Sequence, residues 1–332
     1  MTAGDQPATT PCPSDTPQPG PRHGDSSAPD HAPSDDQCGE LARSYARAAL
    51  RRFVAHRPAL ASAAIVVVLL LLALLAGLLP LPDPTAQGAD VVTDAGPSAQ
   101  HWLGTDSAGR DILSRLIYGL RPAFVAGFAG QSLTMVLGVV LGVTAGYFRG
   151  WPDFVLSRLT DLLFTLPTFV LAFLAVGFLG PQFSQLAGGS GTMLLITVVF
   201  AALGWPGLLR LVRAQTLSLK EQPFVETARA VGSSNWQIIR WHILPGTWGQ
   251  VLVQAAFGVG GFIALESTLS LLGLGVQPPS PDLGAMVASG LDGLTANPFE
   301  SLAPSFVLTM LIVAFVYVGD GLRDALDPRL SA

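Results

Sequence analysis

The side chains that carry acid–base, nucleophilic or metal chemistry are few and scattered in this sequence. The five histidines lie at positions 23, 31, 56, 101 and 242, and both cysteines, Cys12 and Cys38, fall within the first forty residues. No two of these residues have the close helical spacing typical of a metal site, and two cysteines in one polar tail build no disulfide framework. We therefore expect no catalytic residue, no metal site and no cofactor bound by this chain.

The sequence also lacks a phosphate-binding loop. A Walker A loop needs a glycine-rich backbone that ends in Gly-Lys-Ser or Gly-Lys-Thr. The one lysine, Lys220, instead lies in a Ser-Leu-Lys-Glu sequence. If ATP drives a process in which this chain takes part, another chain must bind it.

One carboxylate, Glu266, lies well inside an apolar run, where an unpaired charge is costly. One interpretation places it on a translocation path through a membrane. The other makes it a structural clamp that is hydrogen-bonded inside a helix bundle. The polar residues that would share such a path are Gln131, Thr134, Gln254 and Thr268.

The elements that carry these residues are apolar. Hydrophobic residues make up 50% of the 332 residues and charged residues 12%, with a mean hydropathy of +0.49, whereas about a quarter of an average soluble domain is charged. Apolar runs long enough to cross a bilayer recur along the chain. The predicted spans are residues 59–79, 124–148, 162–179, 192–209, 251–272 and 301–319, with kinks at Pro167 and Pro206. The expected fold is an all-α membrane protein with six transmembrane helices.

The distribution of basic residues predicts the orientation of these spans. If the N-terminus is cytoplasmic, fifteen of the 18 lysines and arginines fall on the inner side. The three outer ones are Arg110, Arg115 and Arg121. By the positive-inside rule both termini are then cytoplasmic.

This topology divides the chain into segments. Residues 1–40 are expected to be a disordered cytoplasmic tail because they are rich in proline and aspartate. A basic juxtamembrane segment, 41–58, precedes the first span, 59–79. Residues 80–123 are an extracytoplasmic segment in which 107–120 has the pattern of an amphipathic interfacial helix, with Arg110, Asp111 and Arg115 on its polar side. Residues 124–320 form the membrane core with a cytoplasmic loop at 210–249, and residues 321–332 are a cytoplasmic C-terminus.

The loop 210–249 has the pattern of two short helices. Pro223 suits a first helical turn, and Gly232 follows Val231 where a left-handed cap is favoured. Ser234 and Gln237 form a capping box that starts a second helix, which is expected to end before Pro245. The spacing also matches a DNA-binding helix-turn-helix, but acids cancel the arginines here, which leaves no charge for phosphates. No nucleic-acid partner is expected, and a plain structural loop is the remaining alternative.

These residues resemble the EAA loop of ABC importer permeases. Glu226-Thr227-Ala228, Gly232 six residues after the glutamate, and Leu244-Pro245 match its pattern. Thr227 replaces an alanine and His242 an isoleucine, and the His-Ile-Leu-Pro form is associated with the dipeptide and oligopeptide branch.

Four further motifs resemble the C-type subunit of that branch, so that the resemblance covers about residues 50–330. They are His101-Trp102-Leu103-Gly104-Thr105-Asp106 with Gly109-Arg110-Asp111, Gly146-Tyr147 with Asp153, Arg158, Asp161 and Pro167, the stretch 269–279, and the stretch 319–328.

The resemblance implies the type I ABC importer fold and a role for the EAA loop as a helix that docks on a cytoplasmic ATPase. The residues implied in this coupling are Phe224, Glu226, Ala228, Arg229, Gly232, Trp236, Leu244 and Pro245. For Phe224 and Trp236, packing inside the bundle is the alternative. Implied partners are a homologous B-type permease, two ABC ATPase subunits or a fused one that use ATP and Mg²⁺, an extracytoplasmic binding protein, and the lipid of a bacterial cytoplasmic membrane.

The function expected is transport of dipeptides or oligopeptides by a non-catalytic permease subunit. Nickel, glutathione or another small solute is the alternative substrate. A secondary transporter that works without ATP is the alternative class, and it predicts ionisable residues in several spans or an inverted repeat. A membrane scaffold with a partner-binding loop would leave the ordered motifs unexplained.

Overall fold

The computed structural model describes residues 47–86, 92–295 and 297–326, and the predicted tail 1–40 lies outside them. The described chain is helical, with one isolated bridge between Thr105 and Asp111. Six of its helical segments are long and apolar enough to cross a membrane, which confirms the number of spans. They are Arg57–Leu78, Ile112–Phe148, Thr168–Leu186, Ser190–Lys220, Asn235–Leu271 and Phe299–Leu326.

The first span consists of α2 (Arg57–Leu75) and the short 3₁₀ helix η1 (Ala76–Leu78). Residues 47–55 before it are also helical. The two helical stretches are separated at His56, whose Nδ1 accepts a hydrogen bond from the Ala59 amide at 3.3 Å and caps α2. The described part of the basic juxtamembrane segment, residues 47–58, is therefore largely helical.

The second span, α3 (Ile112–Phe148), differs from the prediction. It starts 12 residues before the expected position 124 and includes residues 112–120 of the predicted interfacial helix 107–120, whose first five residues are not helical. Asp111 caps α3, where it accepts a hydrogen bond from the Ser114 amide at 2.7 Å. The sequence pattern predicts Arg115 on a polar face, but this residue is 5% exposed. The reason is that it pairs with Asp106, which the chain fold brings next to it.

The third span also differs from the predicted 162–179. Helix α4 (Trp151–Thr165) ends before Pro167, and α5 (Thr168–Lys220) begins directly after it. Pro167 therefore separates two helices instead of kinking one, because the residue before a proline disfavours the helical conformation. Pro206, by contrast, lies inside α5.

Helix α5 contains two spans. Gly188 has a φ of 58°, which interrupts the α-helical geometry. Ala172 and Val176 on one side of it share a buried cluster with Ile196 and Phe200 on the other side. The two halves therefore pack against each other as the third and fourth spans.

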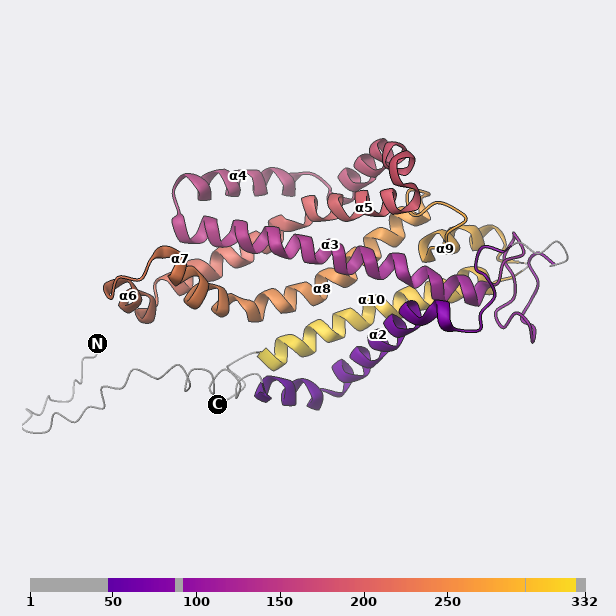
Figure 1. The fold of residues 1–332 in the computed structure, drawn as a ribbon, viewed down its shortest axis with the longest axis horizontal. Helices are drawn as coiled ribbons and strands as arrows, with labels where there is room; N and C mark the ends of the chain where they lie inside the picture. Colours follow the sequence, from indigo (N-terminus) through magenta and orange to yellow (C-terminus); the bar gives the residue numbers. More distant parts are fainter. Residues whose placement is uncertain (1–46, 87–91, 296, 327–332) are drawn as a thin grey trace, which may run out of the picture. The chain divides into compact units, whose positions relative to one another are not determined.

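The remaining helices follow the fourth span. They are α6 (Pro223–Ala230), α7 (Asn235–Ile238), the π-helical η2 (Ile239–Ile243), α8 (Leu244–Leu271), α9 (Leu283–Asp292) and α10 (Phe299–Leu326). Figure 1 shows α6 and α7 at one end of the bundle and α9 at the other. Helix α3 packs on both α5 and α8, and α10 packs on α2, α8 and α9.

Close packing of α3 on α5 uses a repeated register. A β-carbon on Gly138 would lie 2.7 Å from the Leu208 β-carbon, and one on Gly146 would lie 2.7 Å from the Thr216 β-carbon. Gly142 faces Val212 in the same way, four residues along both helices. Small residues thus let the two backbones approach closely, as in other membrane helix pairs.

Candidate functional site

Helix α6, at one end of the bundle, is the short helix predicted from Pro223. Its end is closed by Gly232, whose φ is 91° and whose amide donates to the Arg229 carbonyl at 3.0 Å. The Ser233 amide donates to the Ala228 carbonyl at 3.0 Å. This left-handed cap with paired hydrogen bonds is the expected one, and glycine suits it because it carries no β-carbon.

The predicted capping box also forms. The Gln237 amide donates to Ser234 Oγ at 3.4 Å, and the Ser234 amide donates to Gln237 Oε1 at 2.8 Å. The prediction that this helix ends before Pro245 is wrong, because the chain continues through the π-helical η2 into α8. Proline lacks an amide hydrogen, but Pro245 lies in the first turn of α8, where that donor is dispensable.

One residue of α6 is buried. Val225 is 0% exposed and belongs to an apolar cluster with Val143 and Tyr147 of α3, Val212 of α5 and Ile238 of α7. The single buried side chain attaches α6 to the ends of three other helices. Most of the remaining surface of α6 faces solvent.

The residues implied in coupling lie mostly on that exposed surface. Phe224 is 46% exposed and Trp236 67%, so neither is packed in the core. Phe224 stacks on the His242 ring, with 6.1 Å between ring centroids. Glu226, Arg229 and Pro245 are exposed, whereas Ala228 and Leu244 are half-buried. The result is a short helix with accessible aromatic and charged side chains.

Ion pairs surround this end of the bundle. Arg213 of α5 donates to both carboxylate oxygens of Asp153 of α4, at 2.5 and 2.8 Å. These hydrogen bonds lower the pKa of the Asp153 carboxyl below its usual value. Arg210 donates a single hydrogen bond to Asp161 Oδ1 at 2.7 Å. These pairs bind α4 to the C-terminal half of α5.

The structure does not bring the five residues of the predicted translocation path together. Gln131 and Thr134 of α3 are 4% and 3% exposed, because neighbouring helices pack against α3 at these positions. Gln131 contacts α8 at Gly258, and Thr134 contacts α5 at Gly204. Gln254 and Thr268 of α8 are exposed.

Glu266 is 1% exposed and lies where α8 meets α9. Ser270 Oγ lies 3.1 Å from Glu266 Oε1 and 3.0 Å from Asp282 Oδ2. Asp282 caps α9, where it accepts a hydrogen bond from the Ala285 amide at 3.0 Å. This arrangement favours the clamp interpretation of Glu266. The partner Asp282 is 16 residues away, and the pair was not predicted.

The motif that begins at His101 forms a folded outer segment. Asp106, 3% exposed, accepts hydrogen bonds from the Ala108 and Arg110 amides and from Arg110 Nε, at 2.7–2.9 Å. Asn297 Nδ2 donates to the Ala95 and Thr105 carbonyls at 3.2 and 3.0 Å. The motif therefore holds the outer loops onto the start of α3 and α10.

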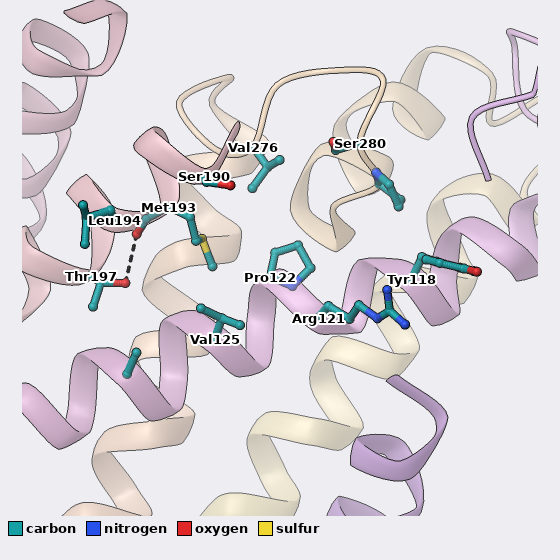
Figure 2. Close-up of a pocket in the computed structure, with 12 residues that line it drawn as sticks. Tyr118, Arg121, Pro122, Val125, Ser190, Met193, Leu194, Thr197, Val276 and Ser280 are labelled. Carbon is teal, nitrogen blue, oxygen red and sulfur yellow. Dashed lines mark hydrogen bonds between the residues drawn. The ribbon is translucent and has the colours of Figure 1, made fainter. Parts of the chain in front are cut away.

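A cavity of about 690 Å³ lies near the same end (Figure 2). Tyr118, Arg121, Pro122 and Val125 of α3 line one side of it. The rest comes mainly from residues 190–197 of α5 and from residues 276–281 of the loop between α8 and α9. Its lining is mostly apolar, and periodicity along one helix gives no signal for it because three separate segments build it.

Within the described residues, no three acidic, histidine or cysteine side chains are placed to hold a metal ion.

Six apolar helices, with an exposed short helix between the fourth and fifth, define a multi-pass membrane protein. The family model of binding-protein-dependent transport system inner membrane components matches residues 138–332, more than half of the chain. The N-terminal transmembrane domain of oligopeptide transport permease C matches residues 44–97. The chain belongs to the binding-protein-dependent permeases and is an inner-membrane protein.

Named relatives are similar over most of the chain. The glutathione transport system permease protein GsiD of Pectobacterium atrosepticum is 38% identical over 85% of this chain and 90% of its own length. The dipeptide transport system permease protein DppC of Alkalihalophilus pseudofirmus is 37% identical over 71% of this chain and 75% of its own length. A GsiD protein of Escherichia coli O157:H7 has the same identity and coverage as DppC.

Proposed function

We propose that this chain is the C-type permease subunit of an ATP-driven importer of small peptides. The observation that carries the proposal is the exposed helix α6, which one buried side chain attaches to the ends of α3, α5 and α7. A short rigid helix with accessible Phe224, Glu226, Arg229 and Trp236 suits a partner's groove. Ala228, Gly232, Leu244 and Pro245 shape this segment and its connection to α8.

The partners follow from this role. A homologous B-type permease would complete the translocation path, and two ABC ATPase subunits, or a fused one, would bind ATP and Mg²⁺. An extracytoplasmic binding protein would deliver substrate to the end that carries α9 and the cavity, with both termini cytoplasmic. This chain would supply no catalytic residue.

The substrate class rests on the relatives. One named relative transports dipeptides and another transports glutathione, which is chemically a tripeptide. We therefore propose peptides of two or three residues as the substrates of this chain.

The test is uptake by the complete transporter in cells that lack other peptide importers. Wild-type cells should accumulate labelled dialanine, and ATP depletion should stop this uptake. The double variant Phe224→Ala/Glu226→Ala should reach the membrane but retain less ATPase on purification, because two exposed contacts are lost. Leu71→Ala is a matched control, since Leu71 is 48% exposed on α2, away from α6.

Two results would overturn the proposal. Uptake that persists after ATP depletion but stops with an ionophore would assign the chain to the secondary transporters. Full ATPase recovery and full uptake by the α6 double variant would show that α6 is not the docking helix. Uptake of labelled glutathione, labelled dialanine and labelled Ni²⁺ by the same cells would assign the substrate within the class, and uptake of Ni²⁺ alone would exclude peptides.

A further inference from the structure

The α6 segment, residues 220–235, contacts Tyr147 of α3 at both of its ends. Lys220, the last residue of α5, donates from Nζ to the Tyr147 carbonyl at 2.5 Å and lies over the Tyr147 ring, 5.1 Å from its centroid. Asn235, the first residue of α7, accepts a hydrogen bond from Tyr147 Oη at 2.8 Å. The segment from 220 to 235 thus leaves and re-enters the bundle at Tyr147, 73 and 88 residues earlier in the chain.

The Tyr147 side chain also packs under α6. It is 4% exposed and shares the apolar cluster with Val225, the one buried residue of α6, and with Ile238 of α7. The Tyr147 ring therefore packs against the buried side of α6. The Tyr147 hydroxyl and backbone carbonyl form hydrogen bonds with Asn235 and Lys220, the residues that flank α6. Helix α6 therefore has side-chain contacts with α3 in addition to its sequence connections to α5 and α7.

The end of α3 is itself held in place. Gly146 packs directly on Thr216 of α5, and Arg149 pairs with Glu221 at 2.9 Å. A displacement of α6 and of the adjoining end of α5 would therefore be passed to the last turn of α3 through these contacts.

Helix α3 connects this end to the opposite one. It runs 37 residues, from Phe148 back to Ile112, or about 55 Å at 1.5 Å per residue. Near its other end, Tyr118, Arg121, Pro122 and Val125 form one side of the cavity (Figure 2). Among the described residues, the helices that line this cavity are α3 and α5. Helix α3 also contacts both ends of the α6 segment, through Tyr147.

We propose that Tyr147 is a positioning residue for transport: it transmits the displacement of α6 to α3, and thereby to the cavity at the opposite end. This inference rests on the proposed docking of α6 on an ATPase. It adds a second route for coupling, through side-chain contacts, to the covalent route through α5 and α8. The bond between Tyr147 Oη and Asn235 Oδ1 is the contact on which this route depends.

The test is Tyr147→Phe, which removes the hydroxyl and keeps the buried ring. Asn235 is exposed, so water replaces the lost donor and folding is little affected. In the complete transporter reconstituted in liposomes, we expect ATP hydrolysis to continue while the peptide transported per ATP falls about two- to thirty-fold. Asn235→Ala, which removes the acceptor, should cause the same loss, and the double variant should lose no more than either single one.

Tyr317→Phe is the matched control. Tyr317 lies in α10, is 46% exposed, and its hydroxyl makes no hydrogen bond within the described chain. Its variant should transport as much peptide per ATP as wild type. A general effect of losing a tyrosine hydroxyl is thereby separated from the effect of this contact.

The outcomes separate this inference from the proposed function. If wild-type liposomes show no ATP-dependent uptake, the proposed function fails. If they do, and both Tyr147→Phe and Asn235→Ala transport as much peptide per ATP as Tyr317→Phe, the role of Tyr147 is overturned. If Tyr147→Phe does not assemble, Asn235→Ala alone decides, because its changed side chain is exposed.

Discussion

The close packing of α3 on α5 predicts that Gly138→Ala destabilises the chain. The new β-carbon would lie 2.7 Å from the Leu208 β-carbon and 2.8 Å from its Cγ and Cδ2. Carbon atoms in contact are normally about 3.5–4.0 Å apart, so the two helices must separate by roughly 1 Å. Leu208 is 2% exposed and has little room to move.

Two effects of opposite sign set the magnitude. An added methyl group in a well-packed core costs about 1–3 kcal/mol. Replacing glycine by alanine inside a helix contributes about 1 kcal/mol in the other direction. The free energy of unfolding should therefore fall by up to about 2 kcal/mol.

A control variant removes the helix-propensity contribution. Gly261 lies inside α8, and a β-carbon there would meet nothing within 4 Å. Gly261→Ala should be neutral or slightly stabilising, so the difference between the two variants isolates the steric cost of about 1–3 kcal/mol.

The assay is unfolding of the purified chain in mixed micelles by increasing SDS, followed by tryptophan fluorescence. The Gly138→Ala midpoint should lie below wild type and the Gly261→Ala midpoint at or above it. Equal midpoints for the two variants would refute the reasoning, because they would show that α3 and α5 are not in close contact at Leu208.

Three further predictions follow from packing and charge. Asp153→Asn should lower the free energy of unfolding by about 1–2 kcal/mol. Because the folded pKa is lowered, the stabilisation is fully present above the usual carboxyl value of 3.8 and disappears as pH falls through the lowered pKa. Chemical unfolding should thus show a constant gap from wild type between about pH 5 and 8 that closes in stronger acid, and a gap that widens in acid would contradict the pairing with Arg213. Val225→Ala should cost about 2 kcal/mol from lost burial and a cavity, and hydrogen exchange should speed up in α6 before the spans. Asn297→Ala should cost about 1–3 kcal/mol and raise exchange at residues 95–105, whereas unchanged exchange there would show that its two hydrogen bonds do not hold the outer loops.

Several features of the fold could be predicted because their signals are local. Apolar runs reveal spans, since each must match the bilayer by itself. Pro223, Gly232 and the Ser234 capping box reveal where the helices of the α6 segment begin and end, since those bonds join residues a few positions apart. The EAA pattern therefore led both to the family and to the exposed helix.

Errors arose where nearby structure changed the effect of a local signal. Arg115 was expected on a polar face, but Asp106 pairs with it and allows its burial. Pro245 was expected to end a helix, but the π-helical turn before it lets the chain continue. In both cases the residue has the local preference that the sequence pattern indicates, and the neighbouring structure changes the effect of that preference.

The sequence by itself determined the membrane class, the six spans, the family and the capped helix α6, because periodicity, length and caps act within a few turns of chain. Only the tertiary structure decided that Glu266 meets Asp282 through Ser270, and that Tyr147 binds both Lys220 and Asn235. These contacts join different helices, and their existence depends on helix packing that single-residue patterns do not specify. The physical reason is that side-chain contacts between distant segments follow from the close approach of backbones, which in this protein the glycines between α3 and α5 allow.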